Sequence, residues 1–329
     1  MRLELKILNF LLFTSIFLLF SNCERKEKVK SLKLGHSLDT KHPVHLGLEF
    51  LSEKVTEISE GKLTIKIYPN GQLGTEREAV ELLQVGSLDM TKVSSAVLEN
   101  FSPTYKVLGL PYIFRDQKHA FSVLDGPIGK ELLTKTEDAW IRGICFYDAG
   151  ARSFYFKDKP IRTPDDLQGM KVRVMNSPIA FSMIKAMGGS PTPISFGELY
   201  TSLQQGVVDG AENNPPSFYS SKHYEVCQYY SLDEHSMVPD VLVISTHAWK
   251  DLNQQERGWL MNAARQSVEF QRKVWAEGVK EALDEVQKAG VEIIRPDKAP
   301  FKASVQSVYE AYEDDPEIQS YIKRIQEVN

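Results

Sequence analysis

The sequence predicts an α/β protein of two similar lobes, each built on a parallel or mixed sheet with flanking helices. The chain has 329 residues, which suits two lobes of about 150 residues each. Strand and helix patterns alternate in both halves, an arrangement typical of sheets covered by helices. The helix–glycine–strand junction LQVGSLD at 83–89 returns as LQQGVVD at 203–209. Two copies of one junction favour two related lobes.

The N-terminus has the pattern of an export signal. Two basic residues precede an apolar run over 7–20, which is too short to span a bilayer comfortably and ends at a small-polar step into Cys23. This pattern predicts a signal peptide over 1–23 of the bacterial lipoprotein type, in which cleavage before Cys23 leaves a lipid-modified N-terminus. The alternative is a plain secretory signal with an incidental cysteine. Residues 24–30 are mostly charged and are expected to form a tether.

The first half of the mature chain alternates strands and helices. A short strand starts at 33–35, and 43–59 predicts an amphipathic helix because its leucine, valine and isoleucine residues share one face. Residues 63–68 alternate apolar and polar side chains, which is typical of a half-buried strand. A helix over 76–85 and a strand over 88–93 continue the alternation.

The same alternation returns in the second half. A strand over 171–174 runs into a helix that begins at Ser177, a favourable capping residue followed by proline. The later elements are expected to be a helix over 196–205, a strand over 207–211, one or two long helices over 249–288 and a final helix over about 301–328.

Composition and motifs argue against several classes of protein. The 39 basic and 44 acidic residues give a net charge of −5 without a basic stripe, so nucleic acid is not an expected partner. The three cysteines cannot form a disulfide framework or a CxxC site, and Cys145 and Cys227 lie in surroundings typical of buried structural thiols. The near pair His42 and His45 is predicted to lie on the surface. Because no HExxH, GxSxG, P-loop or GxGxxG motif occurs, we expect no metal, no cofactor and no catalysis.

Basic residues lie at the predicted carboxyl ends of strands, where open α/β sheets bind ligands. Arg173 lies between two valines of its strand, and the helix beginning at Ser177 offers unpaired N–H groups and the positive end of its dipole. A guanidinium beside a helix N-terminus suits a carboxylate or a phosphate. Arg152 is a second arginine in an apolar strand pattern. The alternative is that the two arginines are surface residues paired with nearby acids, for which the candidates are Asp148, Asp165 and Asp166.

Several motifs follow one another along the chain: GHS at 35–37, YPNGQLG at 68–74, GSLD at 86–89, LPYIFRD at 110–116, LQGMKVRV at 167–174 and VDG at 208–210. On these motifs the chain resembles, over residues 31–329, the solute-binding proteins of tripartite ATP-independent periplasmic (TRAP) transporters, of the DctP type. The resemblance implies a bilobal periplasmic-binding-protein fold with a cleft, hinge strands and a long bracing helix. It implies a first lobe of 31–149 plus about 239–278 and a second lobe of 150–238 plus about 279–329.

The resemblance also implies a ligand site. In the family, the arginine of the strand before the Asn-Ser-Pro segment pairs with the substrate carboxylate, and that position is Arg173 here. A second family arginine corresponds to Arg152, and the asparagine that ends a strand corresponds to Asn213. The other expected ligand contacts are Asn176, Phe196, Glu212 and Asn214 in the second lobe and His36, Ser37, Lys92, Ser94 and Ser95 in the first.

The function implied is that of an extracytoplasmic receptor, which delivers its ligand to a membrane permease driven by an ion gradient. The amides and hydroxyls expected in the site suit a polyol acid, and the run NNPPSFY at 213–219 looks like members that bind hexuronates. We therefore expect D-glucuronate or D-galacturonate. The alternatives are a C4-dicarboxylate or shorter hydroxy acid, a sensor for a signalling receptor, and a lipoprotein enzyme on sugar acids with Glu212 or His36 as general base. A monomer is expected, in the periplasm or at the outer face of the cytoplasmic membrane.

Overall fold

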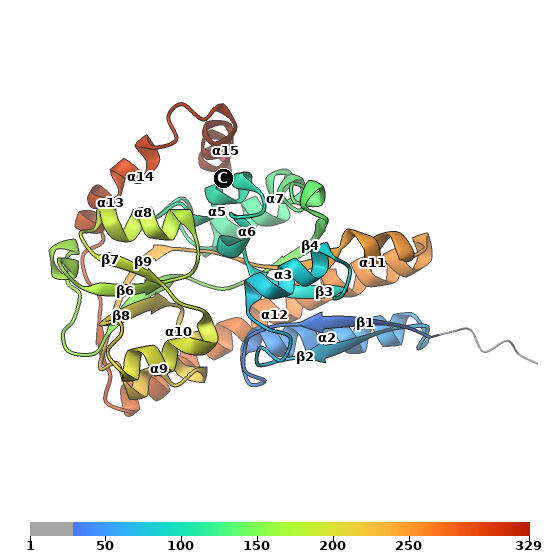
Figure 1. Cartoon of the computed structure of the whole chain (residues 1–329), viewed down its shortest axis with the longest axis horizontal. Helices are drawn as coiled ribbons and strands as arrows, with labels where there is room; N and C mark the ends of the chain where they lie inside the picture. The colour runs from blue at the N-terminus through green and yellow to red at the C-terminus, as the bar shows by residue number, and fades with distance from the viewer. Residues whose placement is uncertain (1–28) are drawn as a thin grey trace, which may run out of the picture.

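The computed structural model describes residues 29–329, which form two mixed sheets with helices packed around them (Figure 1). The expected signal peptide over 1–23, the lipidated Cys23 and most of the tether over 24–30 lie outside the described residues. Within 29–329, no helix combines the length and the apolar character that crossing a bilayer requires.

The first sheet draws its strands from distant parts of the chain. Its order is β2 (Leu63–Tyr68), β1 (Lys30–Gly35), β3 (Met90–Ser94), β10 (Asp240–Ser245) and β4 (Ile141–Tyr147). β1 pairs in parallel with β2 and β3, whereas β10 runs antiparallel to β3 and β4. The expected strands of the first half are therefore present, and β10 is inserted between two of the earlier strands.

The second sheet has the same mixed character. Its order is β11 (Glu292–Ile294), β9 (Tyr229–Ser236), β5 (Arg152–Phe156), β8 (Gly210–Asn213), β6 (Lys171–Val174) and β7 (Ser190–Pro193). β6 is parallel to β7 and β8, and β5 is antiparallel to both of its neighbours. The two sheets confirm the predicted α/β class with two mixed-sheet lobes.

Two short segments carry the chain from one sheet to the other, and residues 246–291 form a third, mainly helical crossing. β4 leads into β5 through residues 148–151, and β9 leads back into β10 through residues 237–239. Gly150 sits in the first crossing at a φ of 58°, and a Cβ there would lie 3.0 Å from Nε1 of Trp275. Both the positive φ and this close approach favour glycine. The two short crossings correspond to the expected hinge strands.

Helices fill the connections between strands. Those of the first half are α2 (Pro43–Ile58), α3 (Glu76–Gln84), α4 (Ser95–Leu98), α5 (Lys106–Gly109), α6 (Gln117–Asp125) and α7 (Pro127–Leu132). The later ones are α8 (Pro178–Ala186), α9 (Leu199–Gln204), α10 (Pro215–Ser220), α11 (Thr246–Asp251), α12 (Gln254–Lys288), α13 (Ala299–Ser304), α14 (Gln306–Glu310) and α15 (Pro316–Glu327). Short 3₁₀ turns are η1 (Pro103–Tyr105), η2 (Glu137–Ala139), η3 (Pro164–Leu167), η4 (Phe196–Glu198) and η5 (His223–Glu225).

Helix α12 braces both lobes, as expected. Its 35 residues extend for roughly 50 Å at 1.5 Å per residue. It packs against α2 and β4 of the first lobe and against α10 of the second, and in Figure 1 it extends from the right of the first lobe to the lower left of the second. Asn253 and Glu256 form a capping box at its start, while Trp275 buries its ring near the hinge.

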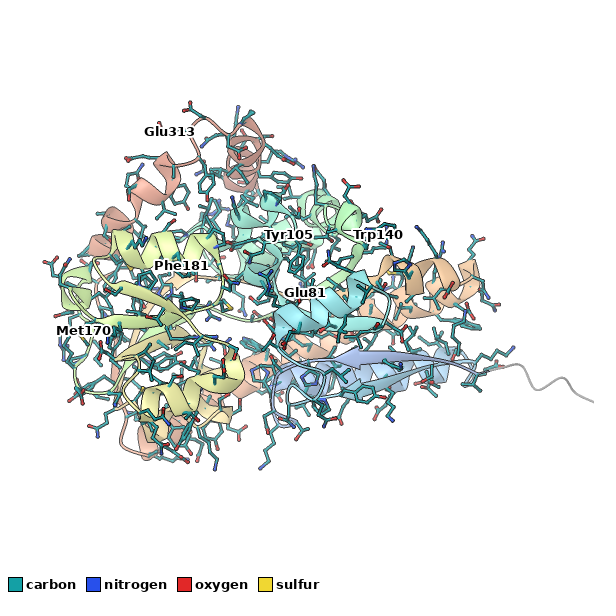
Figure 2. The ribbon with its side chains drawn as sticks, in the orientation of Figure 1. Glu81, Tyr105, Trp140, Met170, Phe181 and Glu313 are labelled. Carbon is teal, nitrogen blue, oxygen red and sulfur yellow. The ribbon has the colours of Figure 1, made fainter. Side chains whose placement is uncertain are left out.

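The two lobes can be located in Figure 2 by the labelled side chains of Glu81, on α3 of the first lobe, and Phe181, on α8 of the second.

Two expectations differ from the structure in detail. The strand expected over 207–211 begins only at Gly210, because Gly206 turns with a φ of 70° and leaves Val207 exposed. The final helix is divided into α13, α14 and α15, since Asp315 caps a new helix that starts at Pro316. α15 packs on α5 and α7, although the expected second lobe includes all of 279–329. The lobe boundaries as numbered therefore stay a prediction.

Candidate ligand-binding site

A cavity of about 650 Å³ lies between the two sheets, at the ends of β3, β6 and β8. Its position agrees with the expectation that ligands bind beyond the carboxyl ends of strands. Nine of the expected contact residues line it: Ser37, Lys92, Ser94, Arg152, Arg173, Asn176, Phe196, Asn213 and Asn214. The other three, His36, Ser95 and Glu212, are not among the lining residues.

Arg173 is a buried cavity residue with unused hydrogen-bonding capacity. It lies on β6 and is 2% exposed. Its Nε donates to the carbonyl of Ile194 at 2.8 Å, and its Nη1 is buried without a hydrogen-bond partner in the part of the chain described. Burial lowers the pKa of its guanidinium, and Phe196 lies with its ring centre 6.0 Å from Cζ. A buried guanidinium without an acid needs an anion, and a ligand carboxylate supplies one.

Two of the three acids suggested as surface partners are engaged elsewhere. Asp148 accepts hydrogen bonds from Gln117 and from the amide of Gly150, and Asp166 caps the turn that begins at Thr163. Among residues 29–329, no ion pair involves Arg173. The alternative of a solvated surface arginine is therefore wrong for this residue.

Arg152 lies in the same cavity wall but is already paired. Its Nε and Nη2 donate to the two carboxylate oxygens of Glu212 at 2.5 and 2.9 Å, and its Nη1 donates to Oδ1 of Asn213 at 2.7 Å. The antiparallel register of β5 with β8 places Ser153 opposite Asn213 and so brings these side chains together. Burial alone would raise the pKa of Glu212, but Arg152 and then His235 lower it to about 2.

Behind Glu212 the polar contacts continue into the second lobe. Nε2 of His235 lies 3.4 Å from Oε2 of Glu212, and Nδ1 lies 2.8 Å from Oδ2 of Asp233. Burial alone would lower the pKa of His235, but the two acids raise it to about 9. Charges of opposite sign thus alternate from Arg152 to Asp233. Glu212, which was expected to contact ligand, does not line the cavity and accepts hydrogen bonds from Nε and Nη2 of Arg152, so its contact with ligand stays a prediction.

The first lobe contributes a second buried ion cluster. Lys92 on β3 places Nζ 2.8 Å from Oε1 of Glu76 and 3.2 Å from Oδ1 of Asp240. Burial alone would lower the pKa of Lys92, but Asp240 and Glu76 raise it. The backbone amide of Ser94 donates to Oε2 of Glu76 at 3.3 Å, while the Ser94 hydroxyl caps α4. All four residues line the cavity.

Three histidines lie beside this part of the first lobe. His42 and His45 are both buried, so the prediction that they lie on the surface is wrong. The reason is that the start of α2 packs under α12, where the His42 ring lies 5.7 Å from that of Trp275. His42 lines the cavity and its Nε2 lies 3.2 Å from the hydroxyl of Ser217 in the other lobe. His36 lies behind it, with Nε2 2.9 Å from Nδ1 of His45.

His36 and Ser95 are buried near the cavity without lining it. Burial, with the nearby charge of Lys92, lowers the pKa of His36 to about 3, so the ring is neutral at ordinary pH. The hydroxyl of Ser95 is buried without a hydrogen-bond partner in the described chain. Ser95 instead starts α4, and its amide donates to the carbonyl of Pro239 in the second hinge crossing. Both residues support the cavity wall from the side away from the cavity.

Comparison with known proteins agrees with this arrangement. A family model described as "Bacterial extracellular solute-binding protein, family 7" (DctP) matches residues 34–315. The chain belongs to this family. A TRAP periplasmic solute-binding protein of Xanthobacter autotrophicus with bound β-D-galacturonate is 40% identical, with 91% of this chain and 100% of the other covered and a TM-score of 0.88.

Two further relatives of the family extend the similarity. A TRAP periplasmic solute-binding protein of Anaerococcus prevotii with bound α/β D-glucuronate is 37% identical, with 91% of this chain and 98% of the other covered and a TM-score of 0.89. A solute-binding protein of Chromohalobacter salexigens is 38% identical over 288 residues, which cover 87% of this chain and 86% of the relative. The similarity of whole chains confirms the bilobal fold of this family for the described residues.

Several cavity residues are not among those predicted from the sequence. They are Asn70, Thr75, Glu76, Ser217 and Asp240, among others. Thr75 offers the clearest signal, because Thr-x-x-Glu at 75–78 is a capping box that marks the start of α3. Asp240 has no comparable signal, since β10 reaches the cavity only by pairing with strands from the first half of the chain.

Proposed function

We propose that the protein is an extracytoplasmic receptor for a hexuronate, with D-galacturonate and D-glucuronate as its ligands. The observation that carries the proposal is the buried guanidinium of Arg173, which lines the cavity with Nη1 unpartnered. The bound sugar acids of the Xanthobacter and Anaerococcus relatives support this class of ligand. In this proposal the uronate carboxylate pairs with Arg173, and amides such as Asn213 and Asn176 contact its hydroxyls.

The energetics are sufficient for a useful receptor. A hydrogen bond to a charged group contributes roughly 1.5–3 kcal/mol net. Two such bonds from Arg173, together with several hydroxyl contacts, reach the ~8 kcal/mol of a micromolar complex after ordering costs. The cavity of about 650 Å³ lies within the range of ordinary small-molecule sites.

Delivery and location complete the proposal. The TRAP relatives support transfer of the ligand to the membrane permease of such a transporter. Export directed by the signal peptide, followed by cleavage before Cys23 and lipid attachment to that residue, would leave a monomeric receptor anchored at the outer face of the cytoplasmic membrane. Palmitate labelling of wild type and of Cys23→Ser in a bacterial host tests the anchor, because only the wild type incorporates the label if Cys23 is modified.

The ligand is tested by thermal unfolding of residues 24–329 with a library of uronates, dicarboxylates and short hydroxy acids. A ligand that binds only the folded state raises the free energy of unfolding by about 2.7 kcal/mol when its concentration is a hundredfold above its dissociation constant. We expect the largest shift with D-galacturonate or D-glucuronate. A shift with dicarboxylates alone would retain the family and overturn the hexuronate. Release of any new product during incubation with stoichiometric protein would instead indicate an enzyme.

A further inference from the structure

Apart from the exposed Arg77, Glu78 and Glu198, the charged residues at the two ends of the cavity carry opposite formal charge. At the second-lobe end, Arg173 has no acid partner, and the charge of Arg152 is balanced by Glu212. At the first-lobe end, Glu76 and Asp240 flank the single ammonium of Lys92 and leave one negative charge in excess. We call these the cationic end (Arg152, Arg173) and the acidic end (Glu76, Lys92, Asp240).

The acidic end has hydrogen-bond acceptors left over. Each carboxylate offers two oxygens with about four acceptor positions, and Glu76 uses one oxygen for Lys92 and the other for the amide of Ser94. Asp240 is bonded to Lys92 through Oδ1. The side chains of Glu76 and Asp240 are 15% and 10% exposed, and both residues line the cavity. Ligand hydroxyls therefore find acceptors there.

Lys92 does not provide an anion site at this end, although it is among the ligand contacts predicted from the sequence. Its side chain is 3% exposed and its ammonium is held by both carboxylates. A second ligand carboxylate placed here would face Glu76 and Asp240 in a partly desolvated cavity, where like charges repel strongly. Specificity of this kind uses a repulsive element as well as attractive contacts.

We propose that Glu76 and Asp240 select sugar acids that carry a single carboxylate. They accept hydrogen bonds from ligand hydroxyls at the end opposite Arg173 and reject ligands with a carboxylate at both ends, such as aldarates and C4-dicarboxylates. This inference rests on the proposed hexuronate function, because it assumes that one carboxylate binds at the cationic end.

The test compares three six-carbon acids by isothermal titration. D-Galacturonate is the proposed ligand, galactarate carries a carboxylate at both ends, and D-galactonate is the open-chain acid with one carboxylate. We expect the wild type to bind galacturonate and galactonate at least tenfold more tightly than galactarate. Glu76→Gln keeps an oxygen for Lys92 and removes the excess charge, so it should reduce this preference at least tenfold. Asp240→Asn is expected to act in the same direction, and provides the measurement if the first variant folds poorly.

The matched control is Glu81→Gln. Glu81 lies on the same helix α3, carries a half-exposed side chain paired with Arg77, and is not among the cavity residues (Figure 2). The control removes the same charge and should leave all three dissociation constants unchanged.

A preference unchanged within twofold in Glu76→Gln and Asp240→Asn, with galacturonate still bound, would overturn the inference and retain the function. If the wild type binds galactonate as weakly as galactarate, the inference is also overturned, because the closed sugar ring of galacturonate, and not its single carboxylate, would then determine the preference. Tighter binding of galactarate than of galacturonate by the wild type would overturn both.

Discussion

Replacing Arg173 by lysine is the most direct test of the carboxylate pair. Nε of Arg173 donates to the carbonyl of Ile194, which leaves the terminal nitrogens of the guanidinium for the ligand. Lysine supplies a compact ammonium and cannot form the same fork. Losing one of two charge-assisted hydrogen bonds costs roughly 1.5–3 kcal/mol, which corresponds to a 10- to 150-fold weaker complex at 1.36 kcal/mol per tenfold.

The assay is titration calorimetry with D-galacturonate, paired with denaturant unfolding of the unligated protein. Because Arg173 has no acid partner, its replacement by lysine keeps the charge and leaves no buried carboxylate unpaired, so we expect the free energy of unfolding to change by less than ~1 kcal/mol. Arg162→Lys is the control, since Arg162 lies on the surface of the same lobe and pairs with Glu292. A dissociation constant for Arg173→Lys within twofold of wild type would refute the carboxylate assignment.

Three further predictions concern stability and reactivity. Arg152→Ala leaves Glu212 buried without its partner and should lower the free energy of unfolding by about 3–5 kcal/mol in guanidinium; a loss below about 1 kcal/mol would contradict the pairing. Burial raises the pKa of Glu99 to about 8, so the folded state keeps a proton that the unfolded state loses above about pH 4.5, and stability falls as pH rises toward 8. The free energy of unfolding of Glu99→Gln, relative to that of wild type, should therefore rise by about 3 kcal/mol when the pH is raised from 5 to 8. A difference in stability between the two proteins that is the same at both pH values would refute this. Burial raises the pKa of the Cys227 thiol to about 12, so it should not react with a disulfide reagent at pH 8 until the protein unfolds, whereas Cys145, which is only partly buried despite the expectation from the sequence, should react slowly in the folded protein; equal rates for the two thiols would contradict this.

Local signals in the sequence predicted many of the elements around the cavity. Ser177 caps α8 through its hydroxyl, which accepts from the amide of Ala180, and the adjacent proline occupies the first turn as expected. The alternating pattern of 63–68 became β2 with the expected bounds. Such signals act over a few residues, so they do not depend on how the rest of the chain packs. The division of the last helix at Asp315 was missed because a long apolar periodicity outweighed one capping residue.

The partners of the site residues were not predictable in the same way. Arg152 and Glu212 are 60 residues apart, and their pairing depends on the register of two antiparallel strands. Asp240 meets Lys92 only because β10 lies next to β3. His42 is buried by a helix that begins more than 200 residues later. Sequence patterns indicated which side chains carry the chemistry, whereas tertiary pairing decided which of them remain free for a ligand.

The position of β10 also sets an order of assembly for the chain. A polypeptide is synthesised from its N-terminus, and domains generally fold as units during or after synthesis. Here the first sheet lacks its central link between β3 and β4 until residues 240–245 are available. The N-terminal half alone therefore leaves two sheet edges unpaired, which is a hazard for aggregation. The first lobe cannot be completed before the second lobe's β5, β6, β7, β8 and β9 have all been made, so the two lobes mature late and together.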